Sequence, residues 1–279
     1  MSRKCLMAFL AHPDDESFGP GGTLAKFAAE GVDVHIVIAT DGAAGSVAEG
    51  FEGIHEELAA VRAKELEAAV AILGGTLHRL DYRDSGYIND PANEHPDAFI
   101  QADETEAVGR LVALIRELRP QVILTHDETG GYFHPDHIFC WKIMTAAFEA
   151  AGQAGMYPEI GPEPYQPERL YYTVIPNRWL KLFIWAMRLR GQDPTKAGRN
   201  QDIDMTRIGV DPTKITTSVY VKPYLATKQA ASAEHSSQGG GGGFTRFIPR
   251  VVLNWLFRYE MFMRAYPPVS APLRENSFF

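Results

Sequence analysis

Short apolar runs alternate with longer segments of helical spacing along the first half of the chain. Residues Lys4 to Leu10 and Val32 to Ala39 are nearly continuous apolar runs, typical of strands buried on both faces of a parallel sheet. Between Glu57 and Leu73 the apolar residues recur every three or four positions, which predicts a helix that Gly74 ends. The same patterns predict strands over 76–80, 122–125, 170–175 and 216–221, and helices over 22–30, 105–118, 136–151 and 223–233.

This alternation of strands and helices predicts an α/β fold, with a Rossmann-like, mostly parallel sheet flanked by helices and joined by right-handed crossovers. Beyond about residue 155 the pattern loosens into a proline-rich connector, and the glycines of 239–243 predict a mobile loop or a plain linker. With 279 residues, of which 45% are hydrophobic, the chain can bury one large core. We expect a single domain over 1–279, in which 1–155 form the core and 156–279 complete the sheet and the pocket.

Net charge and cysteine content limit the possible partners and the cellular compartment of the protein. The net charge of −8 argues against a nucleic-acid partner, because an acidic surface repels phosphates. Two cysteines, Cys5 and Cys140, do not make a disulfide framework, so we expect a cytoplasmic protein. The apolar stretch after Arg3 and Lys4 superficially resembles a secretory signal, but it leads straight into the polar residue His12 and is interpreted as a strand. No stretch reaches the roughly 20 apolar residues that a membrane span requires, and homo-oligomerisation stays open.

Two stretches, 178–188 and 246–257, are rich in both aromatic and basic residues. Such stretches are more often core or oligomer-contact helices. The alternative is that they lie on a membrane surface or cover a long hydrophobic substrate tail. An acidic protein gains less from anionic lipids than a basic one, which favours the first interpretation.

Two polar clusters follow predicted strands. The first, His12-Pro13-Asp14-Asp15-Glu16, comes directly after the opening strand, and the second, Gly130 to His137, comes shortly after the strand at 122–125. Taken singly, each is explained by solvated turn acids or a hydrogen-bonded histidine. Together they are harder to explain structurally, because the carboxyl ends of parallel strands are where α/β proteins bind ligands. We therefore expect both clusters at one rim of the sheet.

The residue types point to a metal. Catalytic zinc sites use three imidazole or carboxylate ligands and leave one position for water, and His12, Asp15 and His137 would supply that set. Asp14 is then left beside the ion and suits the role of proton acceptor. His134 precedes His137 by three residues, so a helix that begins near Pro135 would turn both imidazoles toward one pocket.

Four motifs of the chain resemble those of a known family. The motifs that carry the resemblance are His12-Pro13-Asp14-Asp15-Glu16, Thr40-Asp41-Gly42, Arg83-Asp84-Ser85-Gly86 and Gly131-Tyr132-Phe133-His134-Pro135-Asp136-His137. They are similar to the motif series of the PIG-L/LmbE-like zinc de-N-acetylases, whose relatives include deacetylases and conjugate amidases of mycothiol and bacillithiol metabolism. The resemblance implies Zn²⁺ ligands at His12, Asp15 and His137, a general base at Asp14 and an oxyanion-stabilising histidine at His134.

The resemblance also implies substrate contacts at Arg62, Asp84 and Tyr132. The plain alternatives are a solvated arginine on an amphipathic helix for Arg62 and a turn-capping carboxylate for Asp84. Tyr87 and Phe133 differ from the residues that mycothiol deacetylases have there, which argues against a mycothiol precursor as the substrate.

We therefore expect a metal-dependent hydrolase that removes an N-acetyl group from an N-acetylglucosamine-type amino sugar or its conjugate. Asp14 would take a proton from the attacking water, and protonated His134, its charge favoured by Asp136 or another acid, would stabilise the oxyanion. Alternatives are an amidase acting on mycothiol-like thiol conjugates and a non-catalytic sugar-binding protein on the same scaffold.

A nucleotide-dependent enzyme is a further alternative. The glycine-rich stretch 19–23 lacks the spacing of a dinucleotide fingerprint and the ending of a P-loop, and is better interpreted as a tight strand-to-helix turn. Its backbone amides could still bind a polar substrate group. The remaining histidines, among them His78, His95 and His235, are expected to be surface or packing residues, with His235 the least secure of these assignments.

Overall fold

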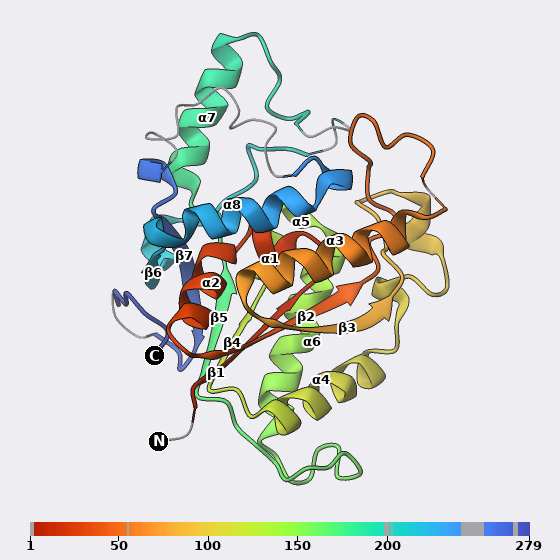
Figure 1. The fold of residues 1–279 in the computed structure, drawn as a ribbon, viewed down its shortest axis with the longest axis vertical. Helices are drawn as coiled ribbons and strands as arrows, with labels where there is room; N and C mark the ends of the chain where they lie inside the picture. Colours follow the sequence, from red (N-terminus) through yellow and green to blue (C-terminus); the bar gives the residue numbers. More distant parts are fainter. Residues whose placement is uncertain (1–2, 55, 198–200, 202, 241–253, 270–272) are drawn as a thin grey trace.

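The structure is a computed structural model that describes all residues except 1–2, 55, 198–200, 202, 241–253 and 270–272. Its centre is one sheet with the strand order β3-β2-β1-β4-β5-β7-β6 (Figure 1). The strands are β1 (Cys5–Leu10), β2 (Asp33–Thr40), β3 (Thr76–Tyr82), β4 (Val122–Thr125), β5 (Arg169–Thr173), β6 (Thr217–Tyr220) and β7 (Tyr259–Tyr266). β1 pairs in parallel with β2 and β4, β3 and β5 extend the parallel part, and β7 runs antiparallel to both neighbours. The predicted mostly parallel α/β fold is confirmed.

Helices cover both faces of this sheet. They are α1 (Asp15–Phe18), α2 (Gly21–Ala29), α3 (Leu58–Leu73), α4 (Glu104–Leu118), α5 (Gly130–Phe133), α6 (Pro135–Ala151), α7 (Asn177–Leu189) and α8 (Leu225–Glu234). Single 3₁₀ turns lie at 91–94, 99–101, 212–214, 222–224 and 236–238. The helices α2, α3 and α8 lie on one face of the sheet, and α4 and α6 lie on the other (Figure 1). Their apolar side chains belong to two buried clusters, one on each face.

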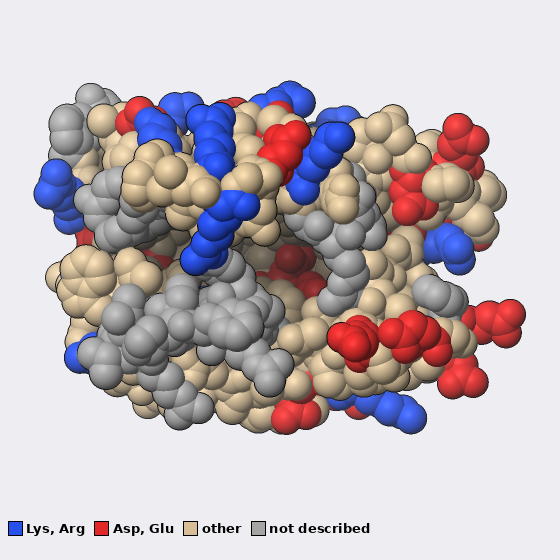
Figure 2. All heavy atoms as spheres, turned by 90° about the horizontal axis from the view of Figure 1, so that it is seen from above, with Lys and Arg blue, Asp and Glu red and all other residues tan. Residues whose placement is uncertain are grey.

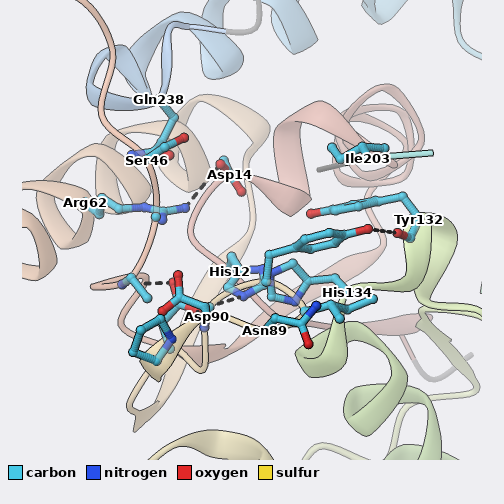
Figure 3. A pocket seen from close by; sticks show the side chains of 17 residues that line it. His12, Asp14, Ser46, Arg62, Asn89, Asp90, Tyr132, His134, Ile203 and Gln238 are labelled. Carbon is cyan, nitrogen blue, oxygen red and sulfur yellow. Dashed lines mark hydrogen bonds and ion pairs between the residues drawn. The ribbon is translucent and has the colours of Figure 1, made fainter. Parts of the chain in front are cut away.

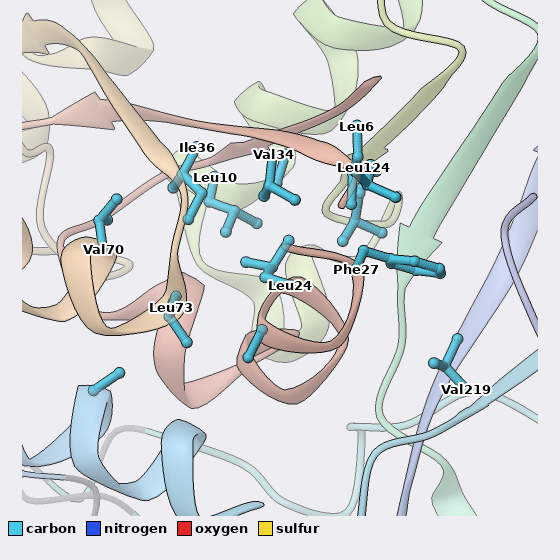
Figure 4. Packing of buried hydrophobic residues seen from close by; sticks show 14 of the residues in the cluster. Leu6, Leu10, Leu24, Phe27, Val34, Ile36, Val70, Leu73, Leu124 and Val219 are labelled. Atoms are coloured by element: carbon cyan, nitrogen blue, oxygen red, sulfur yellow. The ribbon is translucent and has the colours of Figure 1, made fainter. Parts of the chain in front are cut away.

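The double burial follows from the alternation of side chains along each central strand. In β1, Leu6, Ala8 and Leu10 join the cluster with α2 and α3, some of which Figure 4 shows. Met7 and Phe9 join the opposite cluster with α4 and α6. Because both faces are covered, the strand has to be apolar at every position, as its sequence is. β1 is thus held rigidly, and it presents the polar residues that follow it at a fixed place.

β7 was not predicted, although it lies between β5 and β6. Its apolar alternation is interrupted by two charged residues that are paired inside the structure. Glu260 Oε1 lies 2.6 Å from Lys228 Nζ, and Arg264 Nη1 donates to Glu275 Oε1 at 2.6 Å. Both partners lie outside the strand, 32 and 11 positions away, so the sequence of β7 alone resembles a solvated segment.

Glu260 also explains the glycine-rich stretch before α2. Its carboxylate accepts hydrogen bonds from Gly22 N at 3.0 Å and Thr23 N at 2.7 Å, at the start of that helix. An extra Cβ at Gly22 would lie 2.9 Å from Val221 Cβ, so the close approach requires glycine. The stretch is a tight turn, as predicted, but those two amides bind Glu260 and are not available to a substrate or a nucleotide phosphate.

A buried arginine organises the connection from α6 to β5. Arg116 is fully buried on α4, and its guanidinium donates five hydrogen bonds to backbone carbonyls. The acceptors are Ala151, Gln153, Met156, Tyr157 and Ile160. Three of these carbonyls, those of Ala151, Gln153 and Tyr157, also accept from backbone N–H groups. By linking all five, one side chain fixes the proline-rich connector against the core.

The two aromatic, basic stretches have different outcomes. The stretch 178–188 lies entirely in α7, where Trp185 is 59% exposed, so the core interpretation does not hold for that side chain. Most of 246–257, together with residues 241–243 of the glycine run, lies outside the described residues. Among the described helices, none is long and apolar enough to cross a bilayer.

Candidate active site

Three side chains from the two predicted clusters converge where β1 and β4 end. His12 follows β1, Asp15 begins α1 and His137 lies in the first turn of α6. His12 Nδ1 is 3.1 Å from His137 Nε2 and 3.6 Å from Asp15 Oδ2, and His137 Nε2 is 3.4 Å from the same oxygen. For bond lengths of about 2.0–2.1 Å, a tetrahedral zinc ion needs ligand atoms about 3.3–3.4 Å apart. The three atoms therefore have the separations that a small divalent cation requires.

The other ring nitrogen of each histidine fixes which nitrogen faces the cluster. His137 Nδ1 lies 3.1 Å from the carbonyl oxygen of Gly130, which can only accept, so Nδ1 carries the proton. His12 Nε2 lies 3.0 Å from Asp136 Oδ2, a carboxylate oxygen that also accepts from Ser85 N. In these tautomers His12 Nδ1 and His137 Nε2 present lone pairs to each other and to a carboxylate oxygen. With His12 neutral, this arrangement is repulsive unless a cation lies between the three atoms, and it fits a metal ion. Burial opposes a charge on His12, but Asp84, Asp136 and Asp15 raise its pKa, so a proton takes that place in the protein without metal.

Gly130 is required for this geometry. Its φ of +59° is a conformation that L side chains rarely adopt, and an added Cβ would lie 2.9 Å from His137 Cβ. Asp127 Oδ1 holds the same turn by accepting from Thr129 N at 3.1 Å and Gly131 N at 3.0 Å. The turn before α6 therefore sets the direction of His137.

Asp14 lies beside the cluster in a strained conformation, with φ 142° and ψ −25°. Its Oδ2 lies 3.2 Å from Arg62 Nη2, and its backbone N–H donates to Glu16 Oε2 at 3.0 Å. Burial raises the pKa of Asp14 to about 6, although the charge of Arg62 lowers it. The side chain reaches the adjacent pocket, so Asp14 can exchange a proton with a group bound there.

Arg62 is only 2% exposed, so it is not the solvated arginine of the plain alternative. Nη1 donates to Gly42 O at 2.9 Å and Nη2 donates to Pro13 O at 2.6 Å. A Cβ at Gly42 would lie 2.6 Å from the guanidinium carbon, which explains the glycine of the Thr40-Asp41-Gly42 motif. Arg62 thus connects this loop, the turn after β1 and the Asp14 carboxylate.

His134 is the residue that caps α6, which begins at Pro135 as predicted, and its ring lies 5.0 Å from that of His137. Its Nδ1 accepts from Asp136 N at 3.2 Å, so Nε2 carries the proton in the neutral ring. Burial, together with the charge of His12, lowers the pKa of His134 to about 3.

The expected partnership between Asp136 and a protonated His134 is therefore corrected. The carboxylate of Asp136 contacts His12 and Ser85, while only its backbone N–H contacts His134. A neutral His134 can still donate a hydrogen bond from Nε2. The structure thus separates the two residues by role, with Asp136 behind His12 and His134 at the pocket.

Asp84 and Tyr132 also reach the site. Asp84 accepts from Ala44 N and Gly86 N, and its Oδ1 lies 3.5 Å from His12 Nε2. Burial opposes the charge of this carboxylate, but His12 and the Gly86 amide hold its pKa below the ordinary value. Tyr132 stacks on Tyr87, whose hydroxyl donates to Tyr132 O at 2.9 Å. Asp84 therefore does cap a turn, and it also faces the pocket.

These side chains border one cavity of about 430 Å³, within the usual range for a small-molecule site. Figure 3 shows Arg62 and Asp14 on one side of it and Tyr132 and His134 on the other. The lining is mostly polar and includes His12, Asp14, Ser46, Arg62, Asp84, Asn89, Asp90, Tyr132, His134, Ile203 and Gln238. Figure 2 shows a hollow on the face seen from above, with acidic side chains at its bottom. The cavity suits a polar, hydroxyl-rich ligand that is not strongly anionic.

Comparison with known proteins identifies the family. The sequence profile of the PIG-L family, described as GlcNAc-PI de-N-acetylase, matches residues 7–148. A deacetylase of 1D-myo-inositol 2-acetamido-2-deoxy-alpha-D-glucopyranoside from Rhodococcus erythropolis is 38% identical over 252 residues, which cover 85% of this chain and 82% of the relative. The chain belongs to the PIG-L de-N-acetylase family. It is accordingly a hydrolase of the deacetylase type.

Solved structures with the same fold as this PIG-L protein have different activities. The N,N'-diacetylchitobiose deacetylase from Pyrococcus horikoshii superposes with a TM-score of 0.65 at 21% identity, covering 94% of this chain and 83% of that one. The 4-carboxy-2-hydroxymuconate hydratase from Pseudomonas putida superposes with a TM-score of 0.64 at 18% identity, covering 97% and 99%. At such identities the likeness shows the fold alone, so the reaction has to be argued from the site.

The structure adds three buried residues to the PIG-L site that the sequence analysis did not assign to it. His126 follows β4 directly, accepts from Ala11 N at 3.2 Å and stacks on His137 with ring centroids 3.9 Å apart. Glu16 and His235 form a fully buried pair with 2.7 Å between Oε1 and Nε2. The position of His126 at a strand end was a usable signal. The Glu16–His235 contact joins residues 219 positions apart, which no local pattern indicates.

Proposed function

We propose that this protein hydrolyses the acetamide of an N-acetylglucosaminyl conjugate, with one Zn²⁺ held by His12, Asp15 and His137. The convergence of two histidine lone pairs and a carboxylate oxygen within 3.6 Å of one another is the observation that carries the proposal. Asp14 lies beside that set and can accept a proton, which favours a hydrolytic centre. A structural zinc site would instead be closed by a fourth protein ligand.

When bound, the ion supplies Lewis acidity, which polarises an amide carbonyl and makes water nucleophilic near neutral pH. Asp14, oriented by Arg62, accepts the proton that the attacking water loses. His134 donates a hydrogen bond from Nε2 to the developing oxyanion, a role that a neutral imidazole can fill. Asp14 then returns its proton to the departing amine, so the products are a free amino sugar and acetate.

The pocket supports a sugar conjugate as the substrate. Asp84, Asn89, Asp90 and Gln238 offer hydrogen-bonding groups for hydroxyls. Tyr87 and Phe133, which argued against a mycothiol precursor, do not close the cavity. Tyr87 is part of its wall, and Phe133 lies under the guanidinium of Arg207 at 4.8 Å. The inositol glycoside named for the Rhodococcus relative is therefore the first substrate to test.

A comparison of substrates with a matched chelator arm tests this proposal. Purified protein is incubated with N-acetylglucosaminyl-inositol, N,N'-diacetylchitobiose and N-acetylglucosamine, and primary amine and acetate are quantified. We expect equimolar amine and acetate, loss of both after chelation, and recovery on addition of zinc. Absence of acetate from every substrate in zinc-loaded protein would refute the proposed reaction, and cleavage of a thiol conjugate alone would favour the amidase alternative.

A further inference from the structure

Two buried carboxylates hold the segment 235–238, which follows α8. Glu65 on α3 accepts from Ser236 Oγ at 2.9 Å, Ser237 N at 2.8 Å and Ser237 Oγ at 2.6 Å. Glu16 on α1 pairs with His235, and both side chains are 0% exposed. A buried carboxylate is costly unless each oxygen finds a donor, so these contacts fix the segment strongly.

The two carboxylates differ in whether both of their oxygens contact the segment 235–238. Both oxygens of Glu65 face the segment itself. Glu16 has one oxygen on His235, and the other accepts the backbone N–H of Asp14 at 3.0 Å. The Glu16 side chain therefore connects a residue of the distant segment with the residue assigned here as the base.

Asp14 needs such a partner because its backbone conformation is strained. A non-glycine residue at φ 142° is strained and persists only where the surroundings hold it. Asp14 O accepts from Ser17 N and Phe18 N, which fixes the carbonyl side, while Glu16 fixes the N–H side. Released from Glu16, the residue could relax and carry its carboxylate away from Arg62.

We propose that His235 is a positioning residue for Asp14 and acts through Glu16. Its role as an aid to catalysis rests on the proposed function, since only there is Asp14 the base. His235 Nε2 supplies the donor that keeps the Glu16 carboxylate in place, and Glu16 in turn keeps the Asp14 N–H in the strained conformation. Among the described residues, His235 makes no hydrogen bond or ion pair with His12, Asp15 or His137, and it does not line the pocket.

Substitutions of His235 that differ only in reach provide the test. A glutamine places an amide N–H near the position of Nε2, whereas an asparagine is one methylene too short, and a leucine offers no donor. Ser237→Ala is the matched control, because it removes one hydrogen bond to a buried carboxylate from the same segment and leaves Glu16 untouched. For each variant we would measure kcat, KM, bound zinc, and amide hydrogen exchange of peptides covering the turn around Asp14.

We expect His235→Leu and His235→Asn to lose about 10- to 100-fold in kcat, the usual effect of removing a group behind an active-site residue. Zinc content and KM should stay near wild type, and exchange around Asp14 should accelerate. His235→Gln should restore most of kcat and slow exchange. Ser237→Ala should leave kcat and the exchange at Asp14 unchanged, with any effect confined to KM through the neighbouring pocket residue Gln238.

Equal kcat in the Gln and Asn variants, an effect on KM or zinc content alone, or unchanged exchange around Asp14 would overturn the proposal. If the leucine variant does not fold, the Gln and Asn pair decides the question. If wild-type protein deacetylates no substrate, the proposed function fails, and the exchange data alone then decide whether His235 holds Asp14.

Discussion

Replacement of Asp136 tests the fixed tautomer of His12 on which the proposed metal site depends. Asp136 Oδ2 accepts from His12 Nε2 at 3.0 Å and from Ser85 N at 3.1 Å, and the residue is fully buried. Leucine, which is of similar size, removes the oxygen that accepts both hydrogen bonds. Loss of a group that orients a ligand histidine costs about 10- to 100-fold in metal affinity, or about 1.4–2.7 kcal/mol. The unpaired Ser85 N–H should cost about 1–3 kcal/mol of folding stability in addition.

Two further variants separate these effects. Asp136→Asn keeps one oxygen that can accept from both donors, so its zinc affinity should fall less than that of Asp136→Leu. Glu260→Leu removes a carboxylate that likewise accepts from two backbone amides but does not line the cavity, and should lower stability alone. Zinc affinity is measured by competition with a chromophoric chelator, and stability by thermal unfolding of apo protein. A folded Asp136→Leu protein with wild-type zinc affinity would refute the tautomer reasoning.

Three other outcomes follow from the same structure. Asp14→Asn should bind zinc normally while acetate release falls about 10²- to 10⁴-fold, and near-normal turnover would exclude Asp14 as the base. Arg116→Met, which removes five hydrogen bonds to backbone carbonyls, should lower the free energy of unfolding by about 3 kcal/mol in denaturant titrations, whereas an unchanged midpoint would show that water replaces the guanidinium. Burial raises the pKa of Cys5 to about 12 and that of Cys140 well above the ordinary value, so both thiols stay protonated at pH 9. Native protein should therefore resist alkylation at that pH, whereas urea-unfolded protein should be alkylated.

The parallel core was predictable because its strands carry their own signal. Burial on both faces demands continuous apolar residues, so β1, β2 and β4 lie within one or two residues of their predicted bounds. The two polar clusters could be assigned to one rim for the same reason, since parallel strands bring their carboxyl ends together. β7 was missed because Glu260 and Arg264 are charged, and their partners Lys228 and Glu275 cannot be assigned from the local pattern.

Within the site, sequence spacing indicated the residue types but not every contact. His12, Asp15 and His137 were grouped by ligand chemistry, and the structure brings them together. The pairing of Asp136 with His134 was suggested by their separation of two residues, and it is wrong because the start of α6 turns the Asp136 carboxylate toward His12. His235 was expected to be a packing residue, and only the tertiary fold reveals that it reaches Glu16.

The central claim is that His12, Asp15 and His137 together hold one cation. A second set, Asp15, His126 and His137, also lies close enough to share an ion, but His126 Nε2 accepts from Ala11 N and its lone pair is engaged there. Calorimetric titration of zinc into apo His12→Ala and His126→Ala proteins distinguishes the two sets. We predict that His12→Ala loses the site, while His126→Ala still binds one zinc per chain. Stoichiometric binding by His12→Ala and its loss in His126→Ala would contradict the account.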